Sequence, residues 1–313
     1  MRAATFDIVA VGEINADLIL SGDVTPAFGQ AEKLLSDARL FIGSSAAIFA
    51  CGAARLGLRT AIIGKVGTDV FGRFMVDALN QRGVDTSGVV VDPKIPTGLS
   101  VILCKGADRA ILTYPGTISA LRYSEISLPL VRAARHLHLA SFFLLDGLRP
   151  DVPRLFEEAS RSGVTVSMDT NFDPAETWDG GVREALRHVD VFFPNAVEAR
   201  GVAGTGSTDA AINWLAANVG LVAVKLGEQG AAAKQGSTPA ISQAAPAVKV
   251  VDAVGAGDSF DAGFVFGFLS GWDPRRSLEL GVTCGSLSTR KAGGADAQPD
   301  LAEAMQFIES RRR

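Results

Sequence analysis

Between Leu121 and Leu226 the sequence alternates between short apolar runs, rich in β-branched residues, and longer segments with helical spacing. The apolar runs predict strands near Leu137–Ala140, Val164–Met168, Val191–Phe193 and Leu221–Leu226. Helices are predicted near Ser124–Ala134, Val152–Ser162, Val182–His188, Val197–Val202 and Thr208–Asn218. Strands that alternate with helices predict a mainly parallel sheet with helices on both faces, so the chain is typical of an α/β fold.

The composition narrows the class of protein. With 313 residues the chain could hold one large α/β domain or two small ones. Its net charge of −4 argues against binding to nucleic acid or to a membrane surface. Cys51, Cys104 and Cys284 are interpreted as reduced thiols, and the three histidines lack the spacing of metal ligands. Without a transmembrane run or a signal segment after Met1, a cytoplasmic protein is expected.

The stretch from Val250 to Gly271 predicts an anion-binding site. Its Gly255-Ala256-Gly257 segment leaves the backbone unshielded, and Asp258 then begins an apolar helical pattern. Free N–H groups and the helix dipole at such an N-terminus bind phosphate, and a carboxylate beside them could accept a proton from an attacking hydroxyl. The alternative is an ordinary helix start with Asp258 as its N-cap.

Near the N-terminus, a strand predicted over Phe6–Val11 ends at Gly12 and delivers Asn15 and Asp17. Polar residues at the end of a buried strand are where α/β folds bind ligands. Asn15 and Asp17 carry groups that bond hydroxyls, although both residue types also form turns. Further on, Thr97–Leu103 and Arg109–Tyr114 flank a turn at Lys105–Asp108 and predict a hairpin.

Asp252-Ala253-Val254-Gly255-Ala256-Gly257-Asp258 resembles the second signature of the ribokinase-like (PfkB) family of carbohydrate kinases, in which Thr stands at the position of Ala253. The resemblance implies one domain over residues 1–313, a three-layer α/β/α sandwich with a small β-sheet lid from about 13–41 and 95–117. It also implies that the Gly255, Ala256 and Gly257 amides form the anion hole and that Asp258 is the catalytic base.

Ile42–Leu58 resembles the first signature of the family, a Gly-Gly loop that enters a helix. Gly43 matches, whereas Ser44 replaces the second glycine and Ile48 aligns with an Asn that touches the sugar. The resemblance assigns all three positions, with Asn15 and Asp17, to the acceptor. Because Ile48 cannot bond hydroxyls, it favours either an acceptor with an apolar portion or one held mainly by Asn15 and Asp17.

Other matches imply roles in binding ATP and Mg²⁺. Asn195 and Glu198 resemble the Asn-x-x-Glu motif that handles Mg²⁺, through water at Glu198; the alternative for Glu198 is a partner of the helix dipole. Lys225, Gly227 and Gly230 resemble the nucleotide-binding turn, and Gly285 belongs to the region that walls the adenine. Asp169 and Asn171 are expected to line the phosphate cleft unless they only form a turn. Asp252, with nearby carbonyls, could hold a monovalent cation such as K⁺.

These residues predict an enzyme that transfers the γ-phosphoryl group of ATP to a hydroxyl of a sugar or sugar-like alcohol. A nucleoside kinase of the same fold and a ligand sensor with weakened catalysis are the alternatives. The exposed edges of the lid predict a homodimer through the lid. Asp69 is interpreted as a helix cap. Lys65 is expected either to face the substrate or to be solvated.

Overall fold

The computed structural model describes residues 4–105 and 108–312. Its main sheet is built from β1 (Phe6–Val11), β4 (Thr60–Gly67), β5 (Val84–Asp92), β8 (Ala134–Leu139), β9 (Thr165–Met168), β10 (Val191–Phe192), β11 (Leu221–Lys225), β12 (Ala231–Lys234) and β13 (Ile241–Gln243). Their order is β13-β12-β11-β10-β9-β8-β1-β4-β5. Neighbours from β5 to β11 are parallel, and β12 and β13 form an antiparallel edge. The predicted parallel sheet is confirmed.

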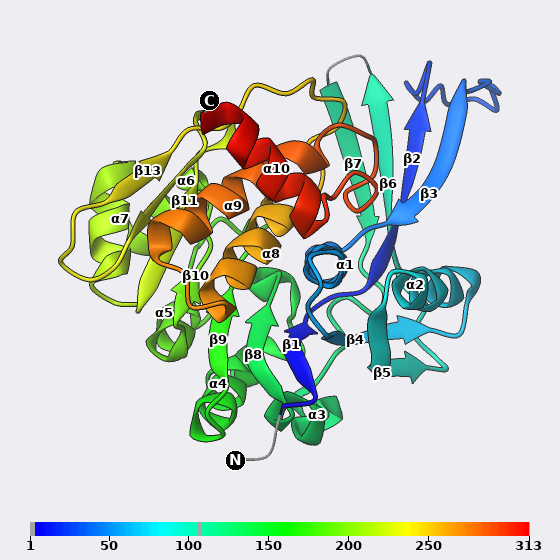
Figure 1. Ribbon diagram of the computed structural model, residues 1–313. Coiled ribbons are helices and arrows are strands. Elements are labelled where there is room, and N and C mark those ends of the chain that lie inside the picture. Colours follow the sequence, from blue (N-terminus) through cyan, green and yellow to red (C-terminus); the bar gives the residue numbers. More distant parts are fainter. Residues whose placement is uncertain (1–3, 106–107, 313) are drawn as a thin grey trace.

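Helices cover both faces of the main sheet (Figure 1). One layer contains α1 (Ser45–Arg55), α2 (Val70–Gln81), α8 (Ala256–Leu269), α9 (Pro274–Ser288) and α10 (Leu301–Arg312). The other contains α3 (Leu128–Arg132), α4 (Val152–Arg161), α5 (Val182–Ala185), α6 (Ala196–Ala203) and α7 (Thr208–Ala216). Because side chains of a strand alternate between faces, Ile8 and Ala10 of β1 join the first layer's core, while Val9 and Val11 join the second. The three-layer architecture is therefore confirmed.

A second, smaller sheet forms the predicted lid. It contains β2 (Asn15–Ser21), β3 (Asp37–Ile42), β6 (Gly98–Lys105) and β7 (Asp108–Tyr114) in the order β3-β2-β6-β7. Strands β6 and β7 are the expected hairpin, paired from Leu99–Tyr114 to Lys105–Asp108. Residues 106–107 of the predicted turn lie outside the described residues. In Figure 1 the lid stands at the upper right, beside α1 and α2.

Several predicted elements differ from the structure. The helix expected over Ser124–Ala134 is only a 3₁₀ turn, Tyr123–Glu125, and the short α3. The helix expected over Val182–His188 shortens to α5 and a 3₁₀ turn. Strands β5, β12 and β13 and helix α10 were not predicted, and β12 is rich in alanine, which is depleted in strands. Arg311 and Arg312 form the exposed last turn of α10, whereas Met1–Ala3 and Arg313 lie outside the described residues.

Some individual residues also have definite structural roles. Asp69 caps α2 as predicted, accepting from the Gly72 N–H. Lys65 is neither solvated nor in the substrate cleft, because its ammonium is buried and pairs with Glu125 at 2.6 Å. His136 and His138 are buried in β8, and both bond the Ser167 hydroxyl, so their role is structural. All three cysteines are free. Among the described residues, no helix combines the length and the apolarity that crossing a membrane requires.

Candidate active site

The polar residues that follow the strands converge at one edge of the main sheet. From β1 the chain moves to β4 and β5 on one side, and later returns to β8 on the other, so β1 and β8 form a topological switch point. In α/β sheets such a point opens a crevice at the carboxyl ends of the strands. Here it contains two cavities of about 570 and 600 Å³. The residues that border both cavities are Lys225, Gly227, Ala253 and Gly257.

The N-terminus of α8 separates the two cavities. Gly255 is its N-cap, with φ of 70° and no side-chain cap, so the alternative that Asp258 caps this helix is wrong. The Ala256 N–H donates to the Ala253 carbonyl at 3.3 Å, and within the described residues the N–H groups of Gly255 and Gly257 donate to no acceptor. Free N–H groups at the positive end of a helix attract an anion.

Asp258 lies in the first turn of α8 and borders the 600 Å³ cavity but not the other one. Its side chain is nearly buried, with 8% of the residue exposed. Burial, together with the negative charge of Asp169, raises the pKa of Asp258 to about 8, while Lys225 opposes this increase. A carboxyl group with this pKa can exchange a proton near neutral pH.

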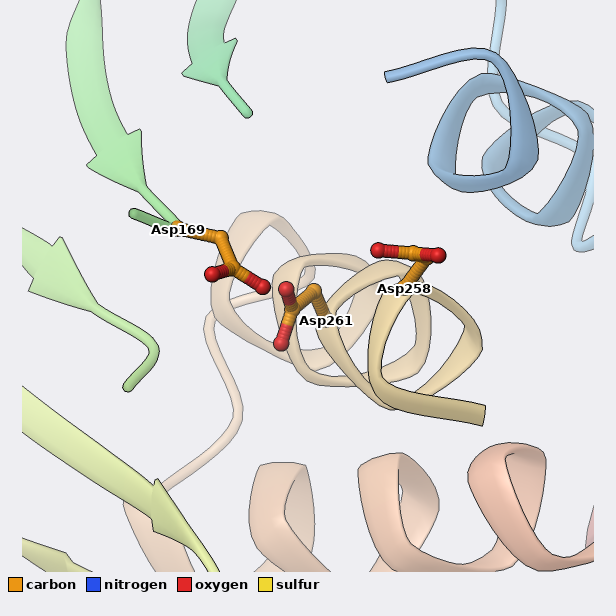
Figure 2. A group of neighbouring side chains, drawn as sticks. All are labelled: Asp169, Asp258 and Asp261. Carbon is orange, nitrogen blue, oxygen red and sulfur yellow. The ribbon is translucent and has the colours of Figure 1, made fainter. Parts of the chain in front are cut away.

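Lys225, at the end of β11, pairs with two buried aspartates. Its ammonium lies 2.6 Å from Asp169 and 3.2 Å from Asp261. Figure 2 shows Asp169 at the end of β9, facing Asp261 of α8, with Asp258 one turn before it. Ligand oxygens of the three aspartates lie within 4.8 Å of one another. Asp261 was not predicted, although its position three residues after Asp258 places it on the same side of a helix.

Opposing effects set the pKa values within this cluster. Burial alone would raise the pKa of Asp169, but the charge of Lys225 holds this pKa below its ordinary value. Burial outweighs Lys225 at Asp261 and raises its pKa well above the usual range. In turn, Asp169 and Asp261 overcome burial and raise the pKa of Lys225. Lys225 therefore keeps its charge next to Gly257 and the free amides.

Asn15 and Asp17 border the 600 Å³ cavity on the lid side, as the sequence predicts for an acceptor site. The Asn15 amide donates to Asp17 at 3.1 Å, which fixes both side chains. Burial, and then the charge of Asp252, raise the pKa of Asp17 to about 7. Gly43 packs so closely against this pair that a Cβ atom would overlap the Asp17 carboxylate. A side chain at position 43 would therefore displace the acceptor pair.

Two departures from the family pattern have physical explanations. Ser44 keeps the left-handed backbone of a glycine, with φ of 71°, and its hydroxyl caps α1 by accepting from the Ala47 N–H at 3.0 Å. Ile48 is only 3% exposed. A Cβ atom built on Gly255 would lie 2.9 Å from Ile48, so this side chain supports the turn before α8. Ile48 thus contributes an apolar part of the cavity wall rather than a polar contact.

Glu13 is a buried residue of the cleft that the sequence did not reveal. Its Oε1 accepts from the Ser45 N–H at 2.7 Å and from the Ser141 hydroxyl at 2.8 Å. Its Oε2 is buried without a partner among the described residues. Burial raises the pKa of Glu13 to about 7, opposed by the hydrogen bond from Ser141. Only its position directly after the first strand could have signalled a place in the site.

Asn171 orients the hydroxyl groups around Glu13 and Asp258. Its amide donates to Ser45 at 2.7 Å and to Ser141 at 2.5 Å. Because each serine hydroxyl accepts a hydrogen bond from Asn171, the hydroxyl proton of that serine is left to donate to a carboxylate. Ser141 donates to Glu13. A hydrogen bond with Ser45 opposes the rise in the pKa of Asp258. Asn171 and Ser141 both adopt positive φ, at 52° and 58°. Such strained residues often cluster at active sites.

Asn195 and Glu198 form a capping box at the start of α6. Glu198 therefore also lies in the first turn of a helix, where its charge interacts with the helix dipole, as the alternative interpretation predicts. The Asn195 N–H and its amide both donate to the Glu198 carboxylate. Both residues border the 600 Å³ cavity. Burial and the charge of Asp169 raise the pKa of Glu198 to about 7. A carboxylate beside a cavity supplies the oxygen ligands that suit a hard cation bound through water, so these residues fit Mg²⁺.

The 570 Å³ cavity lies between the turn after β11 and helix α9. Gly227 and Gly230 border it with φ of 61° and 95°, as a tight turn requires. Gly285 also borders it, but its lack of a side chain serves packing, because a Cβ atom would lie 2.8 Å from the Ala256 carbonyl.

The carboxylate of Asp252 is held by backbone groups. It accepts hydrogen bonds from the N–H groups of Val254 at 3.0 Å and Gly293 at 3.1 Å.

The sequence is similar to those of known carbohydrate kinases. The model of the pfkB family carbohydrate kinases matches residues 5–301. An uncharacterized sugar kinase of Archaeoglobus fulgidus is 33% identical over 79% of this chain and 98% of its own length. A 5-dehydro-2-deoxygluconokinase of Geobacillus thermodenitrificans is 30% identical over 97% of this chain and 93% of its own length.

A solved structure shows the same fold over nearly the whole chain. It is an Escherichia coli protein described as a ribokinase II in complex with ATP and Mg²⁺, with a TM-score of 0.86 and 24% identity. The alignment covers 97% of this chain and 99% of that chain. With the family model spanning almost every element described above, the protein belongs to the PfkB family of carbohydrate kinases.

Proposed function

We propose that this carbohydrate kinase transfers the γ-phosphoryl group of ATP to a hydroxyl of a sugar or sugar-like acceptor held beneath the lid. One observation carries the proposal: two cavities meet at the free N–H groups of α8, and Asp258 borders only the cavity on the lid side. A phosphoryl group passing between two substrates needs a site of this kind, with donors at the crossing point and a base on the acceptor side.

In this mechanism the residues of α8 and β11 have separate roles. The N–H groups of Gly255 and Gly257, with the Lys225 ammonium beside them, stabilise the negative charge that develops on the transferred group. Asp258 accepts the proton of the acceptor hydroxyl as its oxygen attacks the phosphorus. Asn15 and Asp17 hold other hydroxyls of the acceptor, and the turn at Gly227 and Gly230 binds the nucleotide.

Bound Mg²⁺ would neutralise the phosphates of ATP, and Glu198 with Asn195 would hold it through water. The related Escherichia coli protein was solved in complex with ATP and Mg²⁺, which supports the use of both by this chain. The monovalent cation expected at Asp252 stays a prediction, since both carboxylate oxygens accept backbone N–H groups and none of the steps above depends on it.

An acceptor screen tests the proposal directly. Release of ADP from ATP and Mg²⁺ is measured with neutral sugars, with nucleosides, and with keto-deoxy sugar acids, which the name of the Geobacillus thermodenitrificans relative suggests. Mass spectrometry then locates the phosphate on the product. ADP release that depends on a sugar-like acceptor supports the proposal. Preference for nucleosides would instead identify a nucleoside kinase. Absence of any acceptor-dependent ADP release would contradict the proposal and favour a ligand sensor with weakened catalysis.

The pKa of Asp258 leads to a prediction for the pH dependence of turnover. A carboxyl group acts as a base only when ionised, and Asp258 becomes ionised as pH rises through about 8. We therefore expect kcat/KM to rise about tenfold per unit between roughly pH 6 and 7.5 and to level off above the pKa. Initial rates at low acceptor concentration and constant ionic strength measure this profile. A flat profile down to pH 5 would contradict the assignment of the base.

We also propose that two chains pair through the lid. The outer face of β7 exposes Leu112 and Tyr114, which are 61% and 52% accessible, and the lid edges have free backbone groups to pair. Sedimentation is expected to show twice the mass of one chain, and Leu112→Lys is expected to yield monomers. A wild-type protein that sediments as a monomer at assay concentrations would contradict this expectation.

A further inference from the structure

The face of the lid that borders the acceptor cavity changes in character along its strands. Register places paired residues of β2, β6 and β7 in rows on the same face. The first row contains Asp17, Ser100 and Thr113; the second contains Ile19, Ile102 and Ile111; the third contains Ser21, Cys104 and Arg109. Of these, Asp17, Ser100, Ile102, Ile111 and Arg109 border the cavity. The lid thus offers hydroxyl-binding groups, then an apolar row, and then a cation.

The Arg109 guanidinium is lightly held in this cavity. Its Nη1 lies 3.6 Å from Asp252 Oδ1, and the side chain is 44% exposed. Both oxygens of Asp252 already accept backbone N–H groups, from Val254 and Gly293. Within residues 4–105 and 108–312, no hydrogen bond uses the guanidinium of Arg109. As far as the described residues show, its five donors therefore remain available to a ligand.

Arg109 also differs from the other cation that borders the cavity. Lys225 is buried and committed to Asp169 and Asp261. The charge of Arg109 reaches the acceptor pair, because it lowers the pKa of Asp17 against the larger effects of burial and Asp252. A cation with no hydrogen-bonding partner among the described residues, set beside residues that bind hydroxyls, matches a ligand with both hydroxyl and anionic groups.

We propose that Arg109 recognises a carboxylate on the acceptor, so that the preferred substrates are sugar acids with a less polar carbon segment. This inference rests on the proposed phosphoryl transfer and specifies its substrate class. The planar fork of a guanidinium matches a carboxylate through two parallel hydrogen bonds. A carboxylate is favoured over a phosphate because Arg109 is a single cation among several acidic residues and balances one negative charge. Ile102 and Ile111 suit a deoxygenated carbon, which loses little when it leaves water.

Kinetics of Arg109→Gln test the inference. The acceptors are D-gluconate and 2-keto-3-deoxygluconate, with D-glucose and D-glucitol as uncharged counterparts of similar length. Wild type is expected to prefer the acids. Arg109→Gln should raise KM for the acids roughly 10- to 100-fold, the scale of hydrogen bonds to a charged group, with KM for ATP and for neutral acceptors unchanged. Arg109→Lys should recover part of the loss.

Arg39→Gln is the matched control. Arg39 is on β3 of the same lid, 62% exposed and paired with Asp37, and it does not border the cavity. Its replacement removes the same charge from the lid and should leave the kinetics of the acids unchanged. Thermal shift supplies a readout independent of turnover: D-gluconate should raise the Tm of wild type and of Arg39→Gln, but not that of Arg109→Gln.

Several results would overturn the inference while leaving the proposed kinase intact. One is rapid turnover of neutral sugars and sugar acids with equal kcat/KM in wild type. Another is an equal rise in KM for neutral sugars and for sugar acids in Arg109→Gln. That result would mean that Arg109 acts by holding the lid to Asp252 and not by binding a carboxylate of the acceptor. Preference for a sugar phosphate over the acids would assign the guanidinium to phosphate. Absence of ADP release with every acceptor would instead remove the proposed function and this inference together.

Discussion

Replacing Asp258 with asparagine is expected to lower kcat about 10²- to 10⁴-fold, the usual contribution of a positioned general base. Asparagine has nearly the same shape but cannot take the proton of the acceptor hydroxyl at neutral pH. KM for ATP should change little, because Asp258 borders the acceptor cavity and not the nucleotide cavity. Steady-state rates with the best acceptor measure both constants. Asp77→Asn, an exposed carboxylate on α2, is the control and should match wild type.

The stability of Asp258→Asn distinguishes lost chemistry from lost folding. The pKa of Asp258 rises from 3.8 to about 8 on folding, so the folded state binds its proton more tightly than the unfolded state. Wild type therefore loses stability as pH increases between about 4 and 8, and the asparagine variant escapes this loss. We expect Asp258→Asn to have the higher Tm at pH 8 and a smaller advantage at pH 5. Near-normal turnover with this stability pattern would remove Asp258 as the base.

Replacing Gly255 with alanine is expected to lower kcat about 10²- to 10³-fold, the scale for losing donors of an anion hole. Gly255 has φ of +70°, and a Cβ atom there would lie 2.8 Å from Gly294 Cα and 2.9 Å from Ile48 Cγ2. Backbone atoms cannot yield as a flexible side chain can, so the turn before α8 must shift. Such a shift would move the N–H groups that face the transferred phosphoryl group.

Gly271 provides a matched control on the same helix. It follows the C-terminal end of α8 with φ of +71°, and a Cβ atom there would meet nothing within 4 Å. Both alanine variants bear the strain of a left-handed backbone, about 1–2 kcal/mol. Tm should fall in both variants, by more in Gly255→Ala, whereas only Gly255→Ala should lose turnover. Similar kcat values for the two variants would argue against an anion hole at this turn.

The sequence predicted the site best where function follows from position along a strand. Asp169 and Asn195 follow predicted strands and Lys225 lies near the end of one, and the parallel sheet brings all three to one edge. Asn15 and Asp17 were found for the same reason. Periodicity also predicted α8, because its phenylalanines recur at helical spacing and pack against Phe193 of the sheet. Neighbouring residues were sufficient for these inferences.

Contacts between distant residues could not be read in this way. Glu13 and Ser141 are 128 positions apart, and Asn171 and Ser45 are 126 apart, so their hydrogen bonds depend on the completed fold. Pairing of Asp261 with Lys225 is equally non-local. At Ser44, the residue type concealed a backbone conformation that normally selects glycine. Arg109 was read as the start of a strand, and only the lid register places it over the cleft.

A crystal structure with ADP, Mg²⁺, aluminium fluoride and the acceptor chosen by the screen tests the central claim most directly, because the fluoride mimics the transferred phosphoryl group. The account predicts the fluoride within hydrogen-bond distance of the Gly255 and Gly257 amides, and an Asp258 oxygen in contact with the acceptor hydroxyl that points at the aluminium. Fluoride bound away from the N-terminus of α8, or an acceptor hydroxyl that reaches the aluminium without contacting Asp258, would contradict it.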